Sequence, residues 1–431
     1  MRTFTEVVNQ LAAEQSDGLW VRAGASNKGV LAWNPITWSQ LARAVDYVLH
    51  WMETRHGPTA ENETVAYMGI SYVRYPIIIF AMKTGCKIHL TSPHNPQDAQ
   101  VHFLDLTRCT EFVDTPQFAA QMQALAMSHA ELNPVEILWL DDILHHEPSS
   151  ALYDSFRRPR ENGIALILHP RGSTGLPKPI LIYTGALAAM NTTTSMSAPS
   201  GRLNMHDELF APKPTVSMLP LFHIMRITVL VHSICHQGPL AILLPRQLAS
   251  TDLLISAFMQ NKPRAAAFTP SVIEEICNMP NDLETLSTLD YVSYSDAPLA
   301  RSCGDQTAQL TNLQVCIGRT EFLNAPNYLT QEPRDQEYIE WSADTGSVID
   351  PATERSFRMV IQDEHMVRKS DGVDAPTGLA GIEGMVRAAL RACLGSSDRE
   401  YTDDDDDEIF VGAFDSLRVL ALSNILLSLF L

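Results

Sequence analysis

The sequence predicts an α/β protein in which helices pack against the faces of β-sheets. Short apolar runs that are typical of strands alternate with segments of helical periodicity through roughly the first 365 residues. Hydrophobic residues make up 45% of the chain and charged residues 19%, which is the composition of a globular protein and not of a disordered one. The length of 431 residues indicates two or three domains.

The expected helices share apolar residues three or four positions apart, the spacing that lines one face of a helix. Thr37 stands at the head of one of them, where a threonine hydroxyl can cap the first turn. Ser271 and Glu274 have the spacing of a capping box. The expected helices of this region are Phe4–Ala12, Thr37–Met52, Tyr75–Lys83, Ala186–Met190 and Ser271–Cys277.

The expected strands are short apolar runs bounded by polar residues, glycine or proline. Ile164–His169 and Pro179–Tyr183 flank a glycine-rich segment, so this part of the chain is predicted to form a strand, a loop and a second strand. The expected strands are Glu63–Met68, Lys87–Leu90, Ile164–His169, Pro179–Tyr183, Ala241–Leu244, Leu289–Tyr294 and Phe357–Ile361.

A change of composition near residue 365 predicts three parts of the chain: a large α/β domain over residues 1–365, a linker over 366–380, and a helical segment over 381–431. Helices are expected at Ile382–Leu394 and Ser416–Leu431 in the last part. The acidic run at residues 403–408 between them is typical of a solvated loop.

The charge balance excludes some classes of partner. Lysine and arginine number 31 and aspartate and glutamate 50, for a net charge of −19. Such an acidic protein repels phosphate backbones and anionic lipids, so we expect neither nucleic acid nor membrane as partner. No apolar run reaches the roughly 18–20 residues that span a bilayer, and no apolar signal core follows Met1. We therefore expect a cytoplasmic protein.

The seven cysteines are scattered and odd in number, and no two have C-x-x-C spacing. This pattern favours reduced core thiols over a disulfide framework or a zinc site.

The most informative segment is the glycine-rich run from His169 to Pro179. Its glycines allow backbone amides to approach an anion closely, and Ser173, Thr174 and Lys178 add hydroxyl donors and a positive charge. A Walker A loop is excluded because prolines flank Lys178. From these residues alone, a phosphate-binding loop and an ordinary glycine-rich hairpin are equally good interpretations.

Together with three later segments, this run resembles the signature motifs of the adenylate-forming superfamily of acyl-CoA synthetases, luciferases and nonribosomal peptide synthetase adenylation domains. The resemblance covers roughly residues 1–365 and is greatest to fungal nonribosomal-peptide-synthetase-like proteins and adenylate-forming reductases. The later segments are Leu219–His223, Tyr294–Leu299 and Gly318–Glu321.

The resemblance implies a ligase of secondary metabolism that uses ATP and Mg²⁺ to activate a small carboxylic acid. It assigns phosphate binding to Ser173, Thr174, Gly175 and Lys178, and the flank of adenine to Asp296 and Ala297. It also implies that His223 borders the acyl pocket, Thr320 contacts the α-phosphate and Glu321 helps to hold Mg²⁺. No aspartate follows Phe222, which favours an aryl or keto acid over an amino acid.

A second motif, Gly412–Leu417, resembles the Gly-x-Asp-Ser-Leu motif of acyl and peptidyl carrier domains, so we expect residues 381–431 to be a partial carrier segment that lacks the later helices of such a domain. The resemblance implies that a phosphopantetheinyl transferase attaches 4′-phosphopantetheine to Ser416. Taken alone, Asp415-Ser416 is more typical of an ordinary helix cap than of a carrier serine.

The sequence departs from the family pattern in three places. Pro170 and Arg171 replace two hydroxyl residues of the phosphate loop, and Arg226 stands where the family has a small residue. Arg226 is interpreted either as a partner for a second substrate carboxylate or as a surface residue. The small mobile subdomain with its catalytic lysine looks absent, since Lys369 is the only lysine after Lys262. We therefore expect impaired adenylation. The alternative is a non-catalytic remnant or a mis-spliced fragment of a longer protein.

Overall fold

The computed structural model divides the chain into two compact units, one comprising residues 1–172 and 176–342 and the other residues 173–175 and 343–431. In the second unit the structure describes one antiparallel hairpin, β18 (Ser347–Thr353) with β19 (Ser356–Ile361). The described residues are 4–27, 30–56, 63–81, 86–146, 163–169, 178–210, 214–243, 251–295, 297–316, 318–320, 323–324, 326–342, 347–353 and 356–361.

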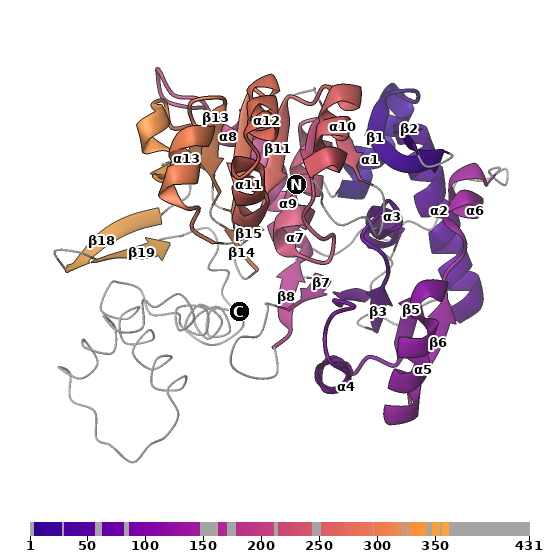
Figure 1. Ribbon diagram of the computed structural model, residues 1–431. Coiled ribbons are helices and arrows are strands. Elements are labelled where there is room, and N and C mark those ends of the chain that lie inside the picture. Colours follow the sequence, from indigo (N-terminus) through magenta and orange to yellow (C-terminus); the bar gives the residue numbers. More distant parts are fainter. Residues whose placement is uncertain are drawn as a thin grey trace, which may run out of the picture. The chain divides into compact units, whose positions relative to one another are not determined.

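The first unit contains a six-stranded sheet with the strand order β6-β5-β3-β4-β7-β8 (Figure 1). Neighbouring strands are parallel except β7 and β8, which pair antiparallel on either side of the glycine-rich segment. In chain order the strands are β3 (Thr64–Met68), β4 (Lys87–Leu90), β5 (Glu111–Asp114), β6 (Asn133–Glu136), β7 (Ile164–Leu168) and β8 (Ile180–Tyr183).

The same unit contains a seven-stranded sheet with the order β13-β12-β11-β9-β10-β1-β2. Only β1 and β2 pair antiparallel, as a hairpin at one edge. Its strands are β1 (Leu19–Asn27), β2 (Val30–Thr37), β9 (Thr215–Ser217), β10 (Leu240–Ile242), β11 (Ala265–Phe268), β12 (Tyr291–Tyr294) and β13 (Asn312–Val315).

The hydrophobic core consists of three clusters, because successive side chains of the central strands point to opposite faces of each sheet. Val65 and Tyr67 of β3 join the largest cluster, which the large sheet also enters through Ala265 and Ala267. The intervening residues point to the opposite faces, where α4 and α5 cover the small sheet and α10, α11 and α13 cover the large one (Figure 1). Because successive side chains of a strand face opposite ways, each sheet is buried on both sides.

The helices take their bounds from apolar spacing and from their caps. Helix α2 (Trp38–His56) begins with a capping box: Thr37 Oγ1 accepts from Gln40 N at 3.3 Å, and Gln40 Oε1 accepts from Thr37 N at 2.9 Å. The other helices are α1 (Phe4–Glu14), α3 (Arg74–Ala81), α4 (Gln97–Thr107), α5 (Ala119–Ser128), α6 (Leu140–His145), α7 (Thr184–Ala189), α8 (Met205–Leu209), α9 (Ile224–Cys235), α10 (Thr251–Asn261), α11 (Pro270–Cys277), α12 (Pro280–Leu283) and α13 (Arg301–Thr307).

One predicted cap is wrong. Helix α11 begins at Pro270, so Thr269 is its N-cap residue and Ser271 lies inside the helix. Proline is well suited to the first helical position, which moves the start of the helix back by one residue. Glu274 instead accepts a hydrogen bond from Ala300 N at 3.1 Å, which ties α11 to the beginning of α13.

The expectation of reduced thiols is also wrong for two cysteines. Cys277 and Cys303 form a disulfide between α11 and α13, with their Cα atoms 6.0 Å apart. The two helices pack side by side on one face of the large sheet, a proximity that a sequence separation of 26 residues does not reveal. Among the other described cysteines, Cys109 and Cys316 are buried free thiols.

The other expected helices and strands of the first unit are confirmed, with shifts of one to several residues at their ends. The hairpin of β1 and β2 was not expected. The proposed domain boundaries remain predictions, and the helices expected at Ile382–Leu394 and Ser416–Leu431 lie outside the described residues. Within the described ranges, no helix is both long enough and apolar enough to cross a bilayer.

Replacing Phe112 by alanine is predicted to destabilise the fold. Phe112 has no exposed surface and lies at the centre of the cluster between the small sheet and α4 and α5. Its loss leaves a cavity that lowers the free energy of unfolding by about 3–5 kcal/mol, measured by urea denaturation. Met127→Ala on α5, where the side chain is 84% exposed, is the control and should change it by less than about 0.5 kcal/mol. Equal effects of the two substitutions would contradict this assignment of the core.

Candidate functional site

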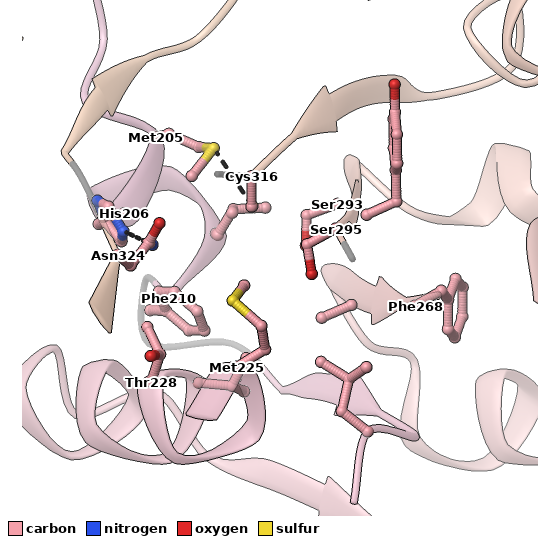
Figure 2. Close-up of a pocket in the computed structure, with 15 residues that line it drawn as sticks. Met205, His206, Phe210, Met225, Thr228, Phe268, Ser293, Ser295, Cys316 and Asn324 are labelled. Carbon is pink, nitrogen blue, oxygen red and sulfur yellow. Dashed lines mark hydrogen bonds between the residues drawn. The ribbon is translucent and has the colours of Figure 1, made fainter. Parts of the chain in front are cut away.

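A small pocket lies at the carboxyl edge of the large sheet, where parallel strands β11, β12 and β13 end side by side (Figure 2). Phe268 is the last residue of β11, and Ser295 and Cys316 directly follow β12 and β13. In open α/β sheets, this edge is the usual position of ligand sites, because the connections to the helices leave a crevice there.

Helices α8 and α9 supply the opposite wall. Met205 and Phe210 come from α8 and the residue after it, and Met225 and Thr228 come from the first turns of α9. Figure 2 shows Met205 directed toward Cys316, with their sulfur atoms 3.8 Å apart. The space open to the centre of a water molecule is only about 20 Å³, which is room for a single water. A larger ligand therefore requires the side chains of this wall to move.

One side of the pocket is polar and uncharged. Asn324 Nδ2 lies 2.7 Å from His206 Nε2 (Figure 2), and the ring of His206 stacks on His232 with centroids 4.1 Å apart. Burial, with a smaller contribution from the charge of His236, lowers the pKa of His206 to about 3. Burial also holds the pKa of His232 well below its ordinary value. Both imidazoles are therefore neutral at neutral pH.

His223 is the N-cap residue of α9. Its Nδ1 accepts a hydrogen bond from Met225 N at 3.4 Å, so this nitrogen carries no proton. The preceding turn is held by Leu221 N, which donates to Ser71 Oγ at 2.7 Å. His223 therefore has a defined orientation at the positive end of α9, beside Met225, which lines the pocket.

Thr320 is buried in the turn that follows β14 (Gly318–Arg319), which pairs with β15 (Leu323–Asn324). This hairpin packs on α9. A Cβ atom on Gly318 would lie 2.5 Å from Leu323 O and 2.8 Å from Met225 Sδ, so the close approach requires glycine. The hairpin thereby brings the segment of Thr320 to the helix that begins after His223.

The glycine-rich segment is described only at its two ends. His169 follows β7, and its Nε2 lies 3.3 Å from Ser92 N, which donates to it, and 3.1 Å from Asn95 Nδ2. Lys178 precedes β8 and is exposed. The strands and the contacts of His169 therefore fix where the segment leaves and rejoins the small sheet.

Of the remaining predicted site residues, the structure describes only Ala297. Ala297 follows β12 and is exposed. Within the described ranges no three His, Cys, Asp or Glu side chains are grouped to hold a metal ion, and Glu321, the expected Mg²⁺ ligand, is outside them. The other predicted residues outside the described ranges are Ser173, Thr174, Gly175, Asp296 and Ser416.

Arg226 is not a surface residue, so that interpretation of it is wrong. It lies in the first turn of α9 with 1% of its surface exposed. Within the described part of the chain, its Nε and Nη1 atoms have no hydrogen-bond partner, and burial lowers its pKa to about 9.

The sequence interpretation missed most of the pocket. Ser295 lies in the segment Tyr294–Leu299 that resembles a family motif. Cys316 was detectable in principle, because it follows a buried strand at the edge where parallel strands end together. Met205, His206 and Asn324 carry no such signal. They lie in short elements away from the ends of β11, β12 and β13 in the sequence, and only the tertiary structure brings them to this pocket.

Comparison with known proteins gives matches over most of the chain. The family model described as AMP-binding enzyme matches residues 21–356. A Neurospora crassa protein named carboxylic acid reductase is 26% identical over 353 residues, which are 80% of this chain and 33% of that protein. The chain thus spans about a third of the length of this relative.

Two solved structures share the fold. ATP-bound MatB from Rhodopseudomonas palustris superposes with a TM-score of 0.62 at 16% identity, over 77% of this chain and 63% of that one. The N-terminal subdomain of Klebsiella oxytoca NpsA, in complex with 3-hydroxybenzoyl-AMSN, superposes with a TM-score of 0.61 at 13% identity, over 77% of each chain.

The stability of the protein is predicted to fall between pH 6.5 and pH 3. The unfolded chain binds a proton at His206 near its ordinary pKa of about 6.5, whereas the folded chain does so only near pH 3. Acid therefore favours unfolding. The contribution of neutral His206 to the free energy of unfolding is fully present above pH 6.5 and is lost as the pH falls toward 3. In His206→Gln, the loss of unfolding free energy between pH 7.5 and pH 5.0 should shrink by about 2 kcal/mol.

Urea denaturation at the two pH values measures the effect. The exposed His94→Gln is the control and should show the pH dependence of the wild type. An unchanged pH dependence in His206→Gln would contradict the neutral state of this imidazole.

Proposed function

Because the chain belongs to the AMP-binding enzyme family, we propose that it activates a small carboxylic acid as an acyl adenylate. A carboxylate oxygen of the acid attacks the α-phosphorus of ATP. The bond between that phosphorus and the oxygen leading to the β-phosphate breaks, and pyrophosphate leaves with the electron pair. The products are acyl-AMP and pyrophosphate.

The observation that carries this proposal is the meeting of three elements around one pocket. The carboxyl ends of β11, β12 and β13, the first turn of α9, and the β14–β15 hairpin all supply residues to it or lie against it. The acid would enter this pocket beside His223, and the Thr320 hydroxyl would donate to the α-phosphate. The two reacting groups would then meet where α9 and the hairpin are in contact.

The nucleotide would be held by groups on either side of this junction. Ala297 and Asp296 would flank adenine, and Ser173, Thr174, Gly175 and Lys178 would bind the phosphates. Two anions must approach each other in this reaction, so positive charge and oriented donors are needed where charge accumulates. Lys178 provides such a charge beside the described end of the loop. Mg²⁺ would further neutralise the phosphates, with Glu321 as its proposed ligand.

The acyl group would then pass to a carrier. In this proposal a phosphopantetheinyl transferase modifies Ser416 with 4′-phosphopantetheine, whose thiol attacks the acyl carbon and releases AMP. Proteins of Aspergillus terreus and Heterobasidion annosum that match the chain are named adenylate-forming reductases, which supports the adenylating step that would precede this transfer.

Pyrophosphate exchange tests the adenylation step. With ATP, Mg²⁺ and a panel of aryl, keto and aliphatic acids, at least one acid should support exchange of labelled pyrophosphate into ATP. Thr320→Val should lower kcat by about 10–100-fold, the worth of a hydrogen bond to a charged group. The exposed Thr54→Val on α2 is the control. If the protein is folded but none of the tested acids supports pyrophosphate exchange, the proposal is contradicted and the non-catalytic alternative is favoured.

Mass spectrometry tests the carrier step. Incubation with a phosphopantetheinyl transferase and coenzyme A should add one phosphopantetheine group to the peptide that contains Ser416. Ser416→Ala should remain unmodified under the same conditions, and Ser423→Ala should be modified like the wild type. Absence of the group from the wild-type peptide would exclude Ser416 as the carrier serine.

A further inference from the structure

The β14–β15 hairpin, which is followed into its turn by Thr320, is too short to maintain its own shape. Each strand has two residues, with Gly318 opposite Asn324 and Arg319 opposite Leu323, and an isolated two-stranded hairpin is at best marginally stable. The backbone of Leu323 is left-handed, with a φ of 66°. A leucine adopts that conformation only where its surroundings hold it. The position of the hairpin therefore depends on contacts from outside it.

Two helices provide such contacts at the same cross-strand pair. On the first strand, Gly318 lies directly against Met225 of α9. On the second strand, Asn324 Nδ2 lies 2.7 Å from Nε2 of His206, which belongs to α8 (Figure 2). The side chain of His206 is buried, with 2% of its surface exposed. The hairpin is thus packed against α9 through one residue and hydrogen-bonded to α8 through the residue opposite.

The imidazole of His206 can serve as an anchor because it is itself held in place. Its ring stacks on that of His232, with centroids 4.1 Å apart. Just before α8, Leu203 O accepts a hydrogen bond from Leu329 N at 2.9 Å, which ties this segment to the chain beyond the hairpin. The amide of Asn324 donates to Nε2, so this nitrogen carries no proton, as the neutral state of the buried ring allows.

We propose that His206 is a positioning residue for adenylation: through Asn324 it fixes the β14–β15 hairpin and thereby the hydroxyl of Thr320. This inference rests on the proposed function, in which Thr320 donates to the α-phosphate. A donor stabilises the transition state only when it is aligned with the charge that develops there, and a displacement of about 1 Å removes most of its effect. His206 acts at a distance from the reacting atoms, through the backbone that Asn324 holds.

Pyrophosphate exchange separates positioning from direct contact with the acid, since His206 and Asn324 both line the pocket. His206→Leu should lower kcat about tenfold by the same factor with every acid that supports exchange, and should leave the KM of the acid nearly unchanged. His206→Gln should restore most of kcat, because its Oε1 atom can accept from Asn324 in the place of Nε2. A loss confined to KM, or one that differs among acids, would assign His206 to substrate binding and overturn the inference.

A double-mutant cycle tests whether the effect passes through Thr320. In the background of His206→Leu or Asn324→Leu, Thr320→Val should lower kcat by no more than about twofold, because the hydroxyl is already misplaced. The control is His236→Leu, which removes an imidazole that lies 3.4 Å from Asp207 in the same aromatic cluster. In that background Thr320→Val should keep its full effect. Effects of His206→Leu and Thr320→Val that simply multiply would overturn the inference.

Hydrogen–deuterium exchange of the unliganded protein provides an arm that needs no turnover. Peptides that contain Leu323 and Asn324 should exchange faster in His206→Leu than in the wild type and at the wild-type rate in His206→Gln. Peptides from β12 are the internal control and should exchange alike in all three proteins. Unchanged exchange in the hairpin would overturn the inference and leave adenylation standing. If no acid supports pyrophosphate exchange, the proposed function fails, and the hairpin peptides still decide whether His206 holds this segment.

Discussion

The burial of helix α9 is the constraint on which the rest of the site depends. Every residue from Ile224 to Ile234 is buried, so the helix is enclosed on all sides. A helix in that position must be apolar around its whole circumference except where a polar group has a partner or a function. One face of α9 borders the pocket, its first turn receives the β14–β15 hairpin, and its start is set by His223. A shift of this helix would displace all three features together.

The close contact between the hairpin and α9 shows how a single residue type preserves this arrangement. Gly318 leaves no room for a side chain against Met225, so the backbone of β14 lies directly on the helix. The turn that follows places Thr320 in a buried position. The contact between Gly318 and Met225 is steric, and it explains why this motif has a glycine two residues before Thr320.

Helix α9 carries one buried cation, and two neutral histidines lie on its pocket side. On the pocket side, the histidines His206 and His232 are buried and neutral, because burial and, to a smaller extent, the charges of neighbouring histidines make protonation costly. At the first turn, Arg226 remains a buried cation whose charge no described residue balances.

The sequence by itself determined the elements whose signals are local. Apolar spacing predicted α1, α2, α3 and the strands β3, β4, β7 and β8, and the pair Thr37 and Gln40 shows why α2 begins where it does. Motif order indicated the family and the neighbourhoods of His223 and Thr320. These features depend on residues within a few positions of one another, and such patterns can be read along the chain.

Only the tertiary structure decided the features that depend on distant segments. The disulfide between Cys277 and Cys303 and the burial of Arg226 both follow from packing against elements remote in the sequence. The pocket is the clearest case, since Met205, Cys316 and Asn324 meet only when the strand ends, α8 and the hairpin converge on α9. Burial and proximity are properties of the packed chain as a whole, and no local pattern specifies them.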